Sequence, residues 1–176
     1  MIAAPSSYSE LRAQVSEALG PCRNPILIGL DGRDGEGKTS AATWLAWQFG
    51  MPAIHLDLFI RRSESEGAIS WRTDDLARCL KARDTKPIII EGVLLLEALA
   101  AIEKSPDYLV FVEKAEPQRG RDRSLDDDDL IDRREFSLSN QVTKYFERRR
   151  PSDIANFKLV WTDCTDDPQH EGELRY

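Results

Sequence analysis

Residues 32–40, GRDGEGKTS, constrain the fold more than any other stretch, because they place three glycines in nine consecutive positions. Glycines at this density weaken any regular helix or strand. The apolar run PILIGL at 25–30 comes just before this loop and predicts a short buried strand. Residues 38–49 predict a helix that ends at Gly50 and Pro52. The sequence therefore predicts a strand, a tight loop and a helix in immediate succession.

The loop matches the pattern G-x-x-x-x-G-K-[ST] in full, with Gly32, Gly37, Lys38 and Thr39 at the fixed positions. Its glycines allow successive backbone N–H groups to turn toward one anion, and the helix that follows adds its positive end. The lysine reaches the β- and γ-phosphates of a nucleotide, and the threonine hydroxyl is placed to ligate Mg²⁺. A glycine-rich turn without a ligand is the alternative, but the complete pattern in this context favours phosphate binding. We expect the nucleotide to contact the loop residues Gly32, Asp34, Gly35, Glu36, Gly37, Lys38, Thr39 and Ser40.

Strands and helices alternate along the rest of the chain. The sequence predicts further strands at 53–59, 86–92, 107–114 and 156–163, and further helices at 7–19, 73–83, 93–104 and 134–150. Thr73 is expected to cap its helix, and Trp44 and Trp47, one helical turn apart, are expected to pack in the core. This alternation is typical of an α/β fold with a five-stranded parallel sheet flanked by helices. We divide the chain into an N-terminal helix at 1–22, a domain at 23–165 and a loose polar tail at 166–176.

Composition argues against several partners. The net charge is −7, which does not suit a protein that coats nucleic acid. The longest apolar stretch, at 87–102, is interrupted by Glu91 and Glu97, which a membrane span would tolerate poorly. The three cysteines have no metal-ligand spacing and suggest free, mostly structural thiols in a reducing compartment. We therefore expect a cytoplasmic protein with no nucleic-acid and no membrane partner.

Two acids end predicted strands, at the edge of a parallel sheet where ligands gather. Asp57 is a candidate base for the proton of an attacking hydroxyl; as an alternative, it caps the strand end. Glu91 is a candidate Mg²⁺ ligand, directly or through water; as an alternative, it is an acid favoured by the start of the next helix. His55, two residues before Asp57, is expected to be a packed or capping residue.

A highly charged segment at about 115–134 has no apolar face of core size. Its arginines, on a movable flap, would neutralise charge that spreads over a transferring phosphoryl group. A solvated loop is the alternative. The arginines of the segment are Arg119, Arg121, Arg123, Arg133 and Arg134.

The order of these motifs resembles the uridine kinase and phosphoribulokinase-like group of P-loop kinases. The stretches LIGLDGRDGEGKTSAATWLA, HLDLFI, IIIEGVLLL, the arginine-rich segment and KYFERRRPSDIANFKLV follow one another as in that group, over residues 26–160. The resemblance implies a P-loop NTPase fold with strand order 2-3-1-4-5, a charged lid at 115–134, and ATP and Mg²⁺ as cofactors.

The resemblance also implies roles for single residues. Lys38, Asp57 and Arg121 are the implied catalytic residues, and Thr39 and Glu91 the implied metal ligands. The implied substrate contacts are Asp57, Phe59, Arg61 and Trp71. Trp71 either stacks on the substrate or anchors a packed loop.

The chain departs from the family at three places. Glu36 stands where the family usually has a serine, which puts a carboxylate near the phosphates unless its side chain points away. Leu58 replaces the family's usual second acid beside the strand-end aspartate. Four adjacent acids at 126–129 form a solvated tip, the first turn of the next helix, or a contact for a cationic substrate.

These observations favour an ATP-dependent kinase that phosphorylates a hydroxyl of a small molecule, such as a nucleoside or a sugar. The alternative is a regulatory module or degenerate kinase that binds a nucleotide without phosphorylating a metabolite. A GTPase switch is disfavoured, because the chain has nothing like the NKxD-type guanine selector.

Overall fold

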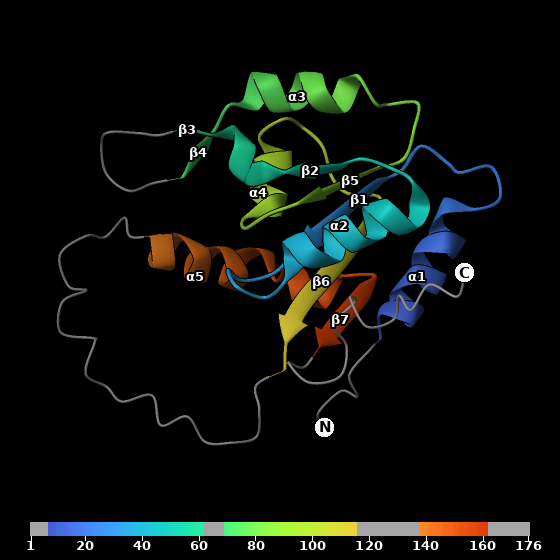
Figure 1. Ribbon diagram of the computed structural model, residues 1–176. Helices are drawn as coiled ribbons and strands as arrows, with labels where there is room; N and C mark the ends of the chain where they lie inside the picture. Colours follow the sequence, from blue (N-terminus) through green and yellow to red (C-terminus); the bar gives the residue numbers. More distant parts are fainter. Residues whose placement is uncertain (1–6, 62–68, 116–137, 162–176) are drawn as a thin grey trace.

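The computed structural model describes residues 7–61, 69–115 and 138–161 (Figure 1). The helices are α1 (Tyr8–Leu19), α2 (Lys38–Phe49), α3 (Thr73–Lys81), α4 (Leu95–Ala100), α5 (Leu138–Arg149) and α6 (Pro151–Ile154), with a 3₁₀ turn η1 (Leu56–Phe59). The strands are β1 (Leu27–Asp31), β2 (Ala53–His55), β3 (Ile60–Arg61), β4 (Ser70–Trp71), β5 (Ile88–Glu91), β6 (Tyr108–Lys114) and β7 (Phe157–Trp161).

Five of these strands form one parallel sheet in the order β2-β5-β1-β6-β7. Counted along the chain, they are its second, third, first, fourth and fifth strands, so the expected order 2-3-1-4-5 is confirmed. The register places Glu91 opposite both Leu30 and His55, which brings the ends of β1, β5 and β2 to one edge. β3 and β4 pair separately and antiparallel, with Ile60 opposite Trp71.

Helices cover both faces of the sheet (Figure 1). On one face α1 and α2 pack against alternate residues of the strands, such as Ile28 and Val110, in one apolar cluster. On the other face α3 and α4 pack against the intervening residues, such as Ile90 and Leu109. A capping box formed by Ser7 and Glu10 begins α1. The α/β fold with a five-stranded parallel sheet is confirmed.

Several local expectations differ from the structure. The predicted strand at 53–59 ends at His55, and the chain turns there into η1. Thr73 is the first residue of α3 rather than its cap; Arg72 holds the cap position without a side-chain hydrogen bond. Trp44 is half-buried and lies edge-on to Tyr8, but Trp47 is 70% exposed, so the expected core packing of Trp47 is wrong.

The cysteines that the structure describes do not build the core. Cys22 and Cys79 are both free and exposed, and Cys164 lies outside the described residues. The described parts of the chain hold no helix with the length and apolar character that crossing a membrane requires.

Candidate functional site

The glycine loop lies between β1 and α2, at the carboxyl edge of the sheet. Gly32 passes so close to β6 that a Cβ atom there would lie 2.4 Å from the carbonyl oxygen of Val112. Gly37 has a φ of 83°, in the left-handed region, and caps α2 without a side-chain hydrogen bond. The first N–H groups of α2 therefore meet no capping side chain, as a phosphate-binding helix start requires.

Lys38 is the buried cation of this loop, only 6% exposed. Its ammonium group donates a hydrogen bond to the carbonyl oxygen of Arg33, at 2.6 Å. Burial lowers the pKa of Lys38, and the charges of Glu91, Asp31, Asp34 and Asp57 oppose that effect. The nearby acids keep the lysine charged, and its partial desolvation strengthens its attraction for an anionic ligand such as a phosphate.

Thr39 and Glu91 meet at the end of β5. The hydroxyl of Thr39 donates to Glu91 Oε1 at 3.1 Å, and His55 Nδ1 lies 2.7 Å from the same oxygen. Glu91 is 3% exposed, so these contacts hold a buried carboxylate in one orientation. Sequence reasoning missed the contact of His55 with Glu91. The register of β2 and β5 places the two residues directly opposite each other.

The oxygen atoms of Thr39 and Glu91 are the kind of ligand that Mg²⁺ prefers. Within residues 7–61, 69–115 and 138–161, no three His, Cys, Asp or Glu side chains gather as a metal site of their own. A magnesium ion held here would therefore take its remaining ligands from phosphate and water, as is usual for nucleotide sites. The donor set fits Mg²⁺ on these terms.

The four implied substrate residues lie in η1 and in the β3–β4 pair. Asp57 is exposed and lies in the 3₁₀ turn just beyond β2, not at the strand end as expected. Arg61 is exposed, and Trp71 is half-buried against the second apolar cluster. Phe59 is 8% exposed and packs in that cluster, which leaves little of its ring for a substrate to contact.

Glu36 points away from the phosphate side of the loop. Its carboxylate accepts a hydrogen bond from the backbone N–H of Lys114, at the end of β6. The indole N–H of Trp161, at the end of β7, donates to the carbonyl oxygen of Glu36 at 2.8 Å. The glutamate side chain therefore braces the loop against the end of β6, and the backbone at this position is held by the end of β7. The other loop residues Asp34, Gly35 and Ser40 are exposed.

Asp31 and Tyr145 form a buried pair at the base of the loop that sequence reasoning missed. Asp31 is 0% exposed and accepts hydrogen bonds from the Tyr145 hydroxyl and, at 2.8 Å, from the Gly32 N–H. Burial raises the pKa of Asp31 to about 6, although the Tyr145 and Gly32 hydrogen bonds and the Lys38 charge oppose the rise. Asp31 directly follows the apolar run PILIGL, so an acid at the end of a buried strand was visible in the sequence. Nothing near it in the sequence indicates that it pairs with Tyr145.

From residue 116 on, the arginine-rich segment lies outside the described residues. Arg119, Arg121, Arg123, Arg133 and Arg134 lie outside the described residues, as does the acidic run at 126–129. Arg33 is the arginine seen at the loop, and its guanidinium lies 4.7 Å from the ring centroid of Phe146.

Comparison with known proteins finds similar folds among solved structures. One similar solved structure is described as a possible uridine kinase from Bacillus stearothermophilus, with a TM-score of 0.59. It is 16% identical to this chain, and the match covers 86% of this chain and 96% of the other. No protein-family model and no curated protein matches. The two chains thus share one fold, a five-stranded parallel sheet flanked by helices, and at this identity the likeness carries the fold alone.

Proposed function

We propose that the chain is a kinase that transfers the γ-phosphoryl group of ATP, with Mg²⁺, to a hydroxyl of a small molecule such as a nucleoside or a sugar. One observation carries the proposal. Three separate segments meet at the carboxyl edge of the sheet: the start of α2 with Lys38 and Thr39, the end of β5 with Glu91, and η1 with Asp57. The Asp57 charge acts on Lys38, so the candidate base lies within electrostatic reach of the candidate phosphate site.

Each residue has a distinct task in this reaction. Lys38 and the N–H groups of the loop hold the phosphates, and Thr39 and Glu91 hold Mg²⁺, which supplies charge neutralisation on the phosphate oxygens. Asp57 takes the proton of the substrate hydroxyl while its oxygen bonds to the γ-phosphorus and ADP leaves. An exposed carboxylate suits this role, because a substrate reaches it without displacing core side chains.

The remaining implied residues stay part of the proposal. Arg61 and Trp71 flank η1 on the β3–β4 pair and are offered as substrate contacts. Phe59 is offered as a support beneath them, because most of its ring is buried. Arg121 is offered as the lid arginine that stabilises the transferring group; it lies outside the described residues.

A screen of candidate hydroxyl compounds tests the proposal. The full chain is incubated with ATP and Mg²⁺ and, in turn, with nucleosides, sugars and other small alcohols, and ADP release is measured. A kinase gives release well above the water blank with one class of compound. Tight ATP binding without release for any class would favour the regulatory module. Leu58, 65% exposed where the family has its second acid, is the feature that supports that second function.

A further inference from the structure

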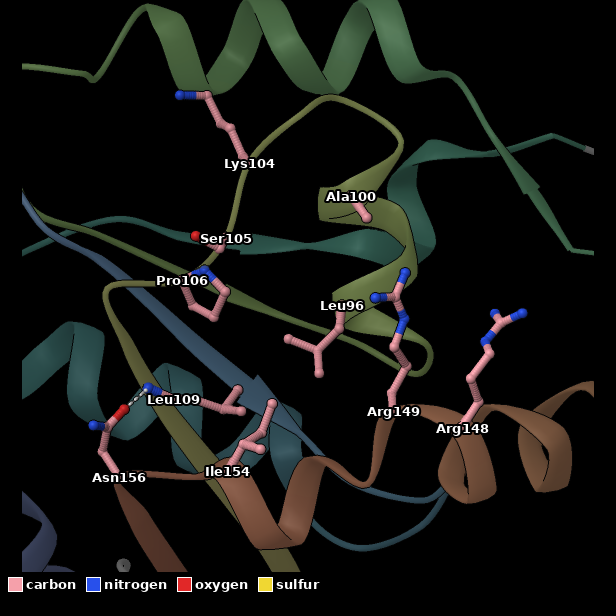
Figure 2. A pocket seen from close by; sticks show the side chains of 10 residues that line it. All are labelled: Leu96, Ala100, Lys104, Ser105, Pro106, Leu109, Arg148, Arg149, Ile154 and Asn156. Carbon is pink, nitrogen blue, oxygen red and sulfur yellow. Dashed lines mark hydrogen bonds between the residues drawn. The ribbon is translucent and has the colours of Figure 1, made fainter.

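A cavity lies away from the glycine loop, between α4, α5, α6 and the start of β6 (Figure 2). Its volume is about 450 Å³, within the range of about 300–1,000 Å³ that is usual for small-molecule sites. No residue of the loop 32–40 lines it. A ligand here would therefore not share contacts with a nucleotide on the loop.

The floor of the cavity is apolar. Leu96 of α4, Leu109 of β6 and Ile154 of α6 line it, and Figure 2 shows the Ile154 side chain directed toward Leu109. Leu109 is 4% exposed, whereas Ile154 is 59% exposed, among the most exposed large apolar residues that the structure describes. An apolar ligand surface that covers Ile154 would be stabilised by the area it removes from water.

The wall contributed by α5 is cationic. Arg148 and Arg149 end this helix and Arg150 follows it, and two of the three are already paired: Arg148 with Glu97 and Arg150 with Asp153. Arg149, the middle one, lines the cavity and has no ion-pair partner among the described residues. Figure 2 shows its guanidinium beside Leu96.

Among the residues that the structure describes, no carboxylate lines the cavity, although the chain as a whole carries a net charge of −7. Lys104 also lies at the rim, and its ammonium points away from the other lining residues (Figure 2). Ser105 adds a hydroxyl, whereas the Asn156 side-chain oxygen already accepts the N–H of Leu109 at 2.7 Å. The chemistry of the lining is thus one unpaired guanidinium above an apolar floor.

We propose that this cavity binds a small organic anion with an apolar body. The charged group lies on Arg149, and the apolar part covers Leu96, Leu109 and Ile154. Charge complementarity selects the anion, since the neighbouring acids Glu97 and Asp153 are engaged by other arginines.

Fluorescence titration of the full chain with 8-anilinonaphthalene-1-sulfonate tests the proposal, because this probe joins an apolar aromatic body to one sulfonate. N-phenyl-1-naphthylamine, which has the same rings and no charge, is the matched neutral probe. Arg149→Gln should weaken binding of the sulfonate about five- to tenfold, a moderate loss because solvent screens an exposed charge, and should leave the neutral probe unchanged. Ile154→Ala should weaken both probes.

Control variants separate this site from others. Arg12→Gln, which removes an exposed arginine on α1, should change neither probe, and Arg149→Lys should keep most of the sulfonate affinity. Lys38→Ala should bind the sulfonate as the wild type does; loss of binding there would place the probe on the glycine loop and overturn the proposal. Wild-type binding by Arg149→Gln, or a signal that does not saturate, would also overturn it. If probe binding falls as the chain dimerises, a second copy of the chain occupies the cavity, and the proposal is overturned.

Discussion

The hydroxyl of Tyr145 donates a hydrogen bond to the carboxylate of Asp31, across 114 positions of the chain. Both side chains are buried, with exposed fractions of 1% and 0%. The Tyr145 oxygen also accepts the backbone N–H of Leu96 at 3.2 Å. Residues from α5, β1 and the start of α4 therefore meet at one point, directly beside Gly32.

Removing the Tyr145 hydroxyl should destabilise the protein. Tyr145→Phe leaves the buried Asp31 carboxylate and the Leu96 N–H without this partner, which typically costs about 1–3 kcal/mol. Urea unfolding at pH 7 measures the loss as a fall in the free energy of unfolding.

Tyr108→Phe is a matched control for this change. The Tyr108 hydroxyl is buried as well, but the structure gives it no hydrogen-bond partner among the described residues. Its removal should leave the free energy of unfolding unchanged or slightly higher. Equal losses in the two variants would show that the Tyr145 hydrogen bonds contribute nothing specific.

Asp31 should make stability depend on pH. Its pKa in the folded chain is about 6, above the ordinary value of 3.8, so the folded state binds this proton more tightly than the unfolded state. The resulting stabilisation is complete below about pH 4 and is lost as the pH rises through 6, by up to about 3 kcal/mol. Asp31→Asn cannot titrate and should not show this loss.

The measurement is the free energy of unfolding of both proteins at several pH values from 4 to 7. The difference between wild type and Asp31→Asn should shift in favour of the variant as the pH rises. Asp84→Asn, at an exposed carboxylate, should run parallel to the wild type over the same range. A constant difference for Asp31→Asn would contradict the raised pKa.

Much of the fold follows from local patterns. Alternating β-branched runs and amphipathic segments predict the sheet and its flanking helices, and the complete glycine motif predicts where β1 passes into α2. The contacts that complete the site are non-local: Tyr145 to Asp31, Trp161 to Glu36 and His55 to Glu91. Such pairs depend on the register of strands and the packing of helices, which a single sequence does not encode at neighbouring positions.

Lys38→Ala should weaken ATP binding. A charge-assisted contact with phosphate is worth about 1.5–3 kcal/mol, which corresponds to a loss of affinity of about tenfold or more. Isothermal titration with ATP in the presence of Mg²⁺ measures the effect. Lys104→Ala is the control, because Lys104 lines a cavity to which no loop residue contributes. Unchanged ATP affinity in Lys38→Ala would remove the basis of the proposed nucleotide site.

Glu36→Ala should also weaken ATP binding, although it removes a negative charge from the loop. Its carboxylate holds the N–H of Lys114, so the truncation loosens the brace between the loop and β6. A purely electrostatic role predicts the opposite sign, because one acid fewer near phosphate favours binding. Asp34→Ala is the control: this exposed loop acid has no such hydrogen bond among the described residues, and its removal should not weaken ATP.

Asp57→Asn separates the two proposed functions. Asparagine keeps the size of the side chain and removes its basicity, so it no longer takes the proton of the substrate hydroxyl. General-base catalysis typically contributes about 10²–10⁴-fold, and kcat should fall by that order. ATP affinity and the free energy of unfolding should stay close to wild type, because Asp57 is exposed in η1 and packs in neither apolar cluster.

Measuring kcat and ATP affinity on the same Asp57→Asn sample distinguishes three roles. If Asp57 is the base, the variant loses turnover and keeps its ATP affinity. If Asp57 is a magnesium ligand, the variant loses both. If Asp57 only caps the chain after β2, the variant loses neither, because asparagine caps equally well. Asp57→Glu is the companion variant, since it restores a carboxylate one methylene further out and should recover part of the turnover that asparagine loses. Full turnover in Asp57→Asn would end the case for Asp57 as the base, because a chain that reacts without this carboxylate must take the proton elsewhere.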